Sequence, residues 1–94
     1  MPELSRSEIL AFLGANVRRR RNALRMTQQD LEARSRFSVQ SISKIERGKT
    51  NIKMDTLRRL ANALGVGPNV LLRTAKLSPA KPGRPRKRPV DRKR

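Results

Sequence analysis

The side chains best suited to chemistry lie between residues 38 and 50, where polar and long basic residues alternate with isoleucine. A helix over this segment places Ile42 and Ile45 on one side, because each residue turns the helix by about 100°. The opposite side then presents four polar residues: Gln40, Ser43, Lys44 and Arg47. Glutamine pairs with adenine in the major groove of a duplex, and lysine or arginine pairs with guanine. The spacing fits contact with base edges, although an ordinary solvated helix face has the same polarity.

The residue types that most enzymes and metal sites need are scarce. The 94-residue chain has no cysteine and no histidine, and its seven carboxylates form no obvious catalytic pair. The usual general base, the thiolate nucleophile and the imidazole ligand are therefore missing. We expect a protein that is not an enzyme and that needs no metal or other cofactor.

The charge of the chain points to a polyanionic partner. Lysine and arginine number 24 against 7 acidic residues, which gives a formal net charge of +17. Such an excess attracts nucleic acid or an anionic membrane. We expect no membrane binding, because no run approaches the roughly 20 apolar residues of a span and the basic C-terminal part lacks a leucine or aromatic face. Aromatic residues for stacking RNA bases are nearly absent too, so double-stranded DNA is the expected partner.

Composition divides the chain near residue 76. Residues 1–75 have a net charge of +9 and helical periodicity, whereas residues 76–94 have a net charge of +8 and four of the six prolines. The second segment has almost nothing apolar to bury, so we expect a disordered basic arm after a single folded domain. The polar N-terminus lacks the apolar core of a secretory signal, which predicts a cytoplasmic protein at the bacterial nucleoid.

The first 75 residues predict an all-α fold of about five short helices. Capping residues and helix breakers mark where these helices begin and end. The marker residues are Ser5 with Glu8, Thr27 with Asp30, Ser38, Gly48, Gly65 and Pro68. Helical periodicity predicts a buried apolar side consisting of Ile9, Leu10, Leu13, Val17, Leu24, Leu31, Met54, Leu57, Leu60, Ala61 and Leu64.

From about residue 17 to residue 66 the chain resembles the Cro/phage-repressor (XRE-type) helix-turn-helix family, whose fold is similar to that of the lambda repressor. The resemblance rests on Arg21, Thr27, Gln28, Leu31, Ser38, Ile42, residues 45–49, Leu57, Ala61 and residues 63–66. It implies that the helix starting near Ser38 enters the major groove. The base contacts implied are Ser38, Val39, Gln40 and Lys44. The phosphate contacts implied are Thr27, Gln28, Ser43, Arg47, Lys49 and Thr50.

The same resemblance implies a structural ion pair, and it also shows where this chain departs from the family. Arg21 and Glu46 match the positions that join the first helix to the recognition helix. Glu32 stands where the family has a small residue, and Arg36 stands where glycine permits a positive φ. Lys53 replaces a serine cap. These departures leave open the exact angle between the helices and, with it, the register of the base contacts.

Within the basic arm, residues 81–88 resemble an AT-hook, a motif that lies in the narrow minor groove of A·T-rich DNA. The implied minor-groove residues are Gly83, Arg84, Pro85, Arg86, Lys87 and Arg88. Pro82 replaces the first arginine of the usual core, so a non-specific basic tail is the alternative.

Together these features predict a sequence-specific transcriptional regulator, specifically a repressor that binds an inverted-repeat operator as a homodimer. Val70, Leu71 and Leu72 form the apolar patch expected at the dimer surface. One alternative is a nucleoid-associated architectural protein that coats A·T-rich DNA. Another is an antitoxin that binds a protein partner, here unknown, and also represses its own operon.

Overall fold

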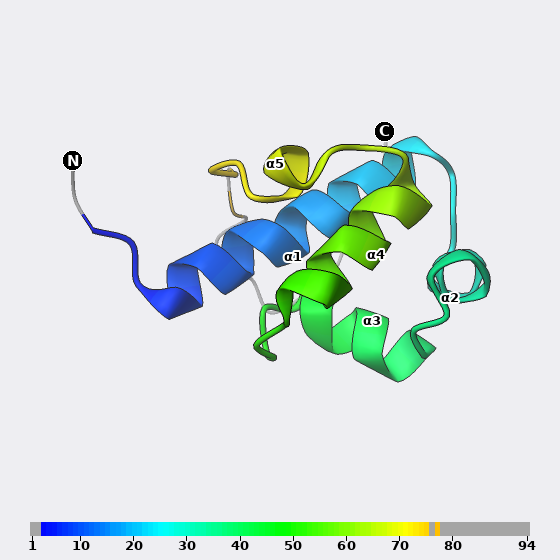
Figure 1. Ribbon diagram of the computed structural model, residues 1–94, viewed down its shortest axis with the longest axis horizontal. Coiled ribbons are helices and arrows are strands. Elements are labelled where there is room, and N and C mark those ends of the chain that lie inside the picture. The colour runs from blue at the N-terminus through cyan, green and yellow to red at the C-terminus, as the bar shows by residue number, and fades with distance from the viewer. Residues whose placement is uncertain (1–2, 76, 78–94) are drawn as a thin grey trace, which may run out of the picture.

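The computed structural model describes residues 3–75 and 77, and five α-helices occur among them (Figure 1). No strand occurs among these residues, which confirms the predicted all-α fold. The arm at residues 76–94, including residues 81–88, lies outside the described residues apart from Leu77. The helices are α1 (Arg6–Ala23), α2 (Gln28–Ser35), α3 (Val39–Glu46), α4 (Met54–Leu64) and α5 (Pro68–Leu71).

The helix ends follow the local signals in the sequence. The Ser5 hydroxyl accepts from the Glu8 N–H at 3.1 Å while the Glu8 carboxylate accepts from the Ser5 N–H at 2.8 Å, so α1 begins with a capping box. Thr27 and Asp30 make the same reciprocal pair at the start of α2, at 3.0 and 2.8 Å. Gly65 ends α4 in the left-handed conformation with φ of +70°.

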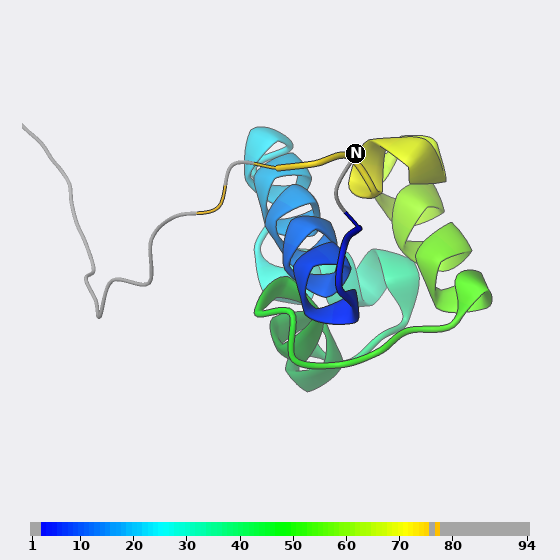
Figure 2. The same cartoon turned by 90° about the vertical axis from the view of Figure 1, so that its left-hand side faces the viewer.

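The helices pack around α1 and α4. Helix α1 contacts α3, α4 and α5, and α2 packs against α3 and α4 (Figure 1). Viewed along α1, the chain places α4 and α5 on one side and α3 below (Figure 2). Among the described residues, no helix combines the length and apolar character that crossing a membrane requires.

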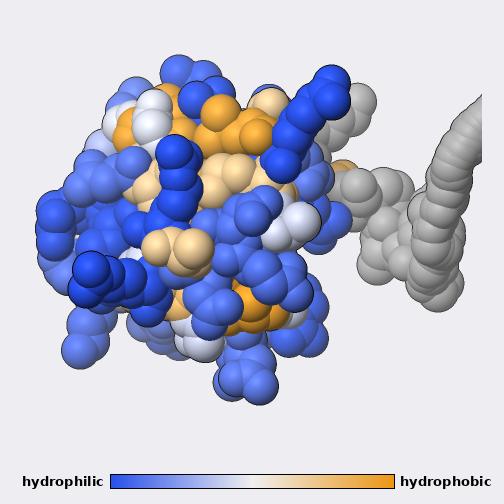
Figure 3. Space-filling model, turned by 90° about the vertical axis from the view of Figure 1, so that its right-hand side faces the viewer, coloured by the Kyte–Doolittle hydropathy of each residue, from blue (hydrophilic) through white to orange (hydrophobic). Residues whose placement is uncertain are grey.

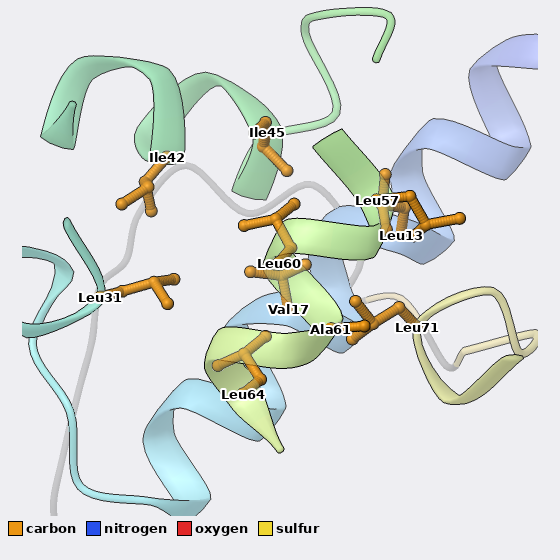
Figure 4. Packing of buried hydrophobic residues seen from close by; sticks show 10 residues of the cluster. All are labelled: Leu13, Val17, Leu31, Ile42, Ile45, Leu57, Leu60, Ala61, Leu64 and Leu71. Atoms are coloured by element: carbon orange, nitrogen blue, oxygen red, sulfur yellow. The ribbon is translucent and has the colours of Figure 1, made fainter. Parts of the chain in front are cut away.

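Buried aliphatic side chains from all five helices meet in one core. Figure 4 shows Leu60 and Val17 at its centre, with Leu31 and Ile42 approaching from the helix-turn-helix and Leu71 from α5. All five of these side chains have no exposed surface. Burying one such side chain contributes roughly 1.5–3 kcal/mol, so the short helices depend on this shared core.

Three apolar residues that periodicity placed inside are exposed instead. Ile9 is 40% exposed and Leu24 is 38% exposed. Leu24 follows the last residue of α1, so the helical period no longer determines its direction. Met54 is 78% exposed because it is the first residue of α4, before the buried side of that helix begins at Leu57. The predicted inward positions were wrong at these helix ends.

Helix α1 approaches the end of α3 closely at Gly14. A Cβ added to Gly14 would lie 2.6 Å from the Glu46 carbonyl oxygen and closer still to that of Ile45. Both of these atoms belong to backbone, which cannot move aside as a flexible side chain would. An isolated glycine inside a helical pattern is the sequence signal for such an approach.

Asn16 joins α1 to the chain at the end of α5. Its buried amide donates to the carbonyls of Leu71 at 3.0 Å and Arg73 at 2.8 Å. Sequence reasoning missed this contact, although a polar residue on the apolar side of a helix indicates an internal hydrogen bond.

We predict that Asn16→Ala lowers the free energy of unfolding by about 1–3 kcal/mol, because it leaves two carbonyls without their donor. Asn22→Ala is the matched control, since Asn22 is an exposed asparagine of the same helix. It should change stability by less than about 0.5 kcal/mol. Urea unfolding followed by circular dichroism measures both, and equal losses would rule out the proposed role of Asn16.

Candidate nucleic-acid interface

Helix α3 presents one apolar and one polar side, as the spacing predicts. Ile42 is fully buried and Ile45 is 4% exposed. On the other side Gln40, Lys44 and Arg47 are exposed, while Ser43 is half-buried. The polar side therefore faces away from the core and remains open to a ligand.

Two of the four residues implied to read bases present free long side chains. Gln40 and Lys44 are exposed, and their side chains form no hydrogen bond with the described residues. Val39 is half-buried. The Ser38 hydroxyl caps α3 by accepting from the Ser41 N–H at 3.1 Å, and it donates to the Ser41 hydroxyl at 3.0 Å. Gln40 and Lys44 are therefore the long polar side chains that this face of α3 leaves free.

Two groups of implied phosphate contacts flank α3. Thr27 and Gln28 are at the start of α2, where N–H groups without an intrahelical partner favour an anion. Lys49 and Thr50 follow α3, and Lys49 is exposed. Thr50 and Lys44 both line a hollow of about 400 Å³. The Arg47 Nε donates to the Ser43 carbonyl at 3.3 Å, which orients its guanidinium along α3.

The side chain of Gln28 has a partner within the protein. Its amide donates to the Glu46 Oε1 at 3.2 Å, so it lies on the carboxylate that ends α3. The resemblance implied a phosphate contact for this residue. Its backbone N–H, at the first position of α2, remains suited to an anion.

Arg21 and Glu46 form a charged contact between α1 and α3. The Arg21 Nε lies 2.6 Å from Glu46 Oε2, and its second terminal nitrogen lies 3.0 Å from Oε1. The remaining nitrogen donates to the Met26 carbonyl at 2.8 Å. The side chains are 13% and 4% exposed. The hydrogen bonds that Arg21 donates to Glu46 raise the pKa of the Arg21 guanidinium above its usual value, so Arg21 stays charged.

The turn between α2 and α3 adopts the conformation for which the family uses glycine. Arg36 has φ of +68°. The Ser35 hydroxyl accepts from the Phe37 N–H at 3.2 Å, and the Arg59 guanidinium donates to the Ser35 carbonyl at 3.0 Å. Arg59 also lies 4.2 Å from the centre of the Phe37 ring. Sequence reasoning missed this contact from α4, which fixes the turn.

Comparison with known proteins supports the same interpretation. A helix-turn-helix family model matches residues 17–71. The chain is 48% identical over 55 residues to the uncharacterised HTH-type transcriptional regulator y4dJ of Sinorhizobium fredii, covering 58% of this chain and 71% of that protein. It is 43% identical over 56 residues to an uncharacterised transcriptional regulator in the ATPase CF(0) region of Rhodospirillum rubrum, covering 60% of this chain and 52% of the other.

Solved structures of transcription regulators have the same fold. The restriction-modification controller protein C.AhdI from Aeromonas hydrophila superposes with a TM-score of 0.64 at 29% identity, covering 66% of this chain and 94% of that one. The clp gene regulator ClgR from C. glutamicum gives a TM-score of 0.64 at 30% identity, covering 74% and 87%. The chain belongs to the Cro/phage-repressor (XRE-type) helix-turn-helix family. It is a DNA-binding transcription regulator rather than an enzyme.

We predict that Glu46→Ala lowers the free energy of unfolding by about 3–5 kcal/mol, because it leaves the Arg21 charge buried without its partner. Asp55→Ala is the control, since it removes an exposed pair with Arg58 of 2.7 Å. Solvent screens that pair, so its loss should have little effect. Chemical denaturation of both variants tests this expectation, and similar losses would contradict a structural role for the buried pair.

Proposed function

We propose that this regulator is a repressor that binds an inverted-repeat operator as a homodimer, with α3 in the major groove. The observation that supports the proposal is the exposed pair Gln40 and Lys44 on a helix whose other side is buried. Both side chains are long enough to reach base edges, and an amide and an ammonium distinguish adenine and guanine from the other bases.

The residues proposed to contact phosphates on either side of α3 favour a defined register of the protein on the duplex. Phosphate contacts from the start of α2 and from Lys49 and Thr50 would lie on either side of the base-reading residues. Contacts of this kind orient a protein on DNA, while base contacts determine the sequence. An architectural protein that coats A·T-rich DNA needs no such arrangement around a polar recognition helix.

The dimer surface proposed from the sequence needs one correction. Leu71 is fully buried in the core and Val70 is half-buried, so these residues contribute to the fold. Leu72 is 46% exposed and remains available for contact with a second copy. A two-fold arrangement places the two α3 helices about one helical turn of DNA apart, which is about 34 Å.

We assign the basic arm a second DNA contact. Residues 83–88 supply glycine, proline and four basic side chains, which suit the minor groove or the phosphates beside the operator. Selection of bound sequences from a random duplex pool tests both proposals. A palindromic consensus supports the repressor, and A·T-rich flanks support minor-groove binding by the arm. A featureless A·T preference contradicts the repressor and favours a coating protein.

We predict that Gln40→Ala and Lys44→Ala each weaken binding to the selected operator by about 1–3 kcal/mol, with little change on unrelated DNA. Asn62→Ala, an exposed substitution on α4, is the control and should bind both duplexes as the parent does. Affinities measured at one fixed salt concentration provide the comparison. Equal weakening on both duplexes would show that these residues do not read bases.

A further inference from the structure

A basic cavity of about 620 Å³ lies between α2 and the C-terminal ends of α1 and α4. Its lining includes four arginines and an apolar part. Figure 3 shows the α2 side of the molecule, where strongly hydrophilic side chains surround paler, apolar surface. The residues that matter here are Arg20, Arg34, Arg36 and Arg59, with Leu24 and Leu64.

The fold holds three of these arginines in place. The Arg20 Nε donates to the Leu64 carbonyl at 3.0 Å, and Arg34 donates to the Ala63 carbonyl at 3.2 Å. Arg59 donates to the Ser35 carbonyl at 3.0 Å. Each of these hydrogen bonds uses one of the several N–H groups of a guanidinium. No hydrogen bond to the described residues uses the other N–H groups of these three side chains.

No carboxylate lines the cavity, so nothing among its lining residues neutralises the four positive charges. Guanidinium groups brought together in this way repel one another and attract anions. Arg36 also has a left-handed backbone with φ of +68°, which a glycine would adopt without strain. Strained backbone at a non-glycine residue is concentrated at functional sites, and this strain places a fourth arginine at the cavity.

We propose that this cavity binds a small ligand with two or more adjacent phosphates. Guanidinium groups match phosphate oxygens with paired hydrogen bonds, and the volume lies in the range of small-molecule sites, about 300–1,000 Å³. Duplex DNA is not the occupant, because none of the lining arginines belongs to the proposed DNA contacts on α3 and its flanks. An inorganic polyphosphate and a nucleoside polyphosphate share the required chemistry. Leu24, which is 38% exposed, adds apolar contact for the organic part of the second.

The experiment titrates the full-length, isotope-labelled chain with inorganic triphosphate and with a nucleoside triphosphate while amide resonances are followed by NMR. Because the whole chain is basic, any anion is attracted to it. The readout is therefore which residues show changes in amide chemical shift. We expect them at Leu24, Asn62 and Gly65, which line the cavity. Tighter binding of the nucleoside triphosphate than of inorganic triphosphate identifies a nucleotide as the ligand. Equal binding of the two shows that the cavity recognises the phosphates alone. Shifts confined to α3 and to residues after 77 would overturn the proposal.

A pair of matched variants isolates the cavity from general charge. Arg36→Gly removes one cavity arginine and its backbone strain, so the fold should persist. Arg25→Gly removes one charge and the same kind of strain, since Arg25 has φ of +58°, but Arg25 does not line the cavity. We expect about a tenfold loss of triphosphate binding at the cavity for Arg36→Gly only. Equal losses in both variants, or tighter binding of poly-glutamate than of triphosphate there, would overturn a phosphate site.

Discussion

The contact between Arg21 and Glu46 determines where the recognition helix sits. Helix α3 has only eight residues, too few to be stable alone, so its position depends on what it packs against. Its apolar side enters the core, but the end nearest α1 is fixed by a buried charged pair of 2.6 Å. The absence of a side chain at Gly14 lets the two helices come close enough to form that pair. The polar side of α3 faces outward as a consequence of these contacts.

The basic side chains of the described residues differ in what they contact. Arg20, Arg34 and Arg59 donate to carbonyls at the C-terminal ends of α4 and α2, where backbone acceptors lack helical partners and the helix dipole favours cations. These side chains therefore contribute to the fold. Lys44 and Lys49 differ, because no hydrogen bond joins their exposed side chains to the described residues. Net charge alone would have assigned all of them to DNA.

Local features could be predicted from the sequence, and distant contacts could not. The two capping boxes and the left-handed end of α4 involve residues at most five positions apart, so the sequence pattern contains all the information they need. Asn16 bonds to carbonyls 55 and 57 residues away, and Arg59 to one 24 residues away. No periodicity identifies such partners. Family resemblance suggested that Arg21 and Glu46 meet, but it did not show that Gln28 also donates to Glu46.

The central claim is that the polar side of α3 lies on the floor of the major groove, and site-directed cross-linking tests it most directly. Because the chain contains no cysteine, Gln40→Cys introduces a unique thiol, and Asn62→Cys provides a control on α4. Each variant is mixed with operator duplexes that have a thiol-reactive group on one base, in either the major or the minor groove. The account predicts a cross-link from position 40 to the major groove alone and none from position 62. Minor-groove cross-linking from position 40, or equal yields from both positions, would contradict it.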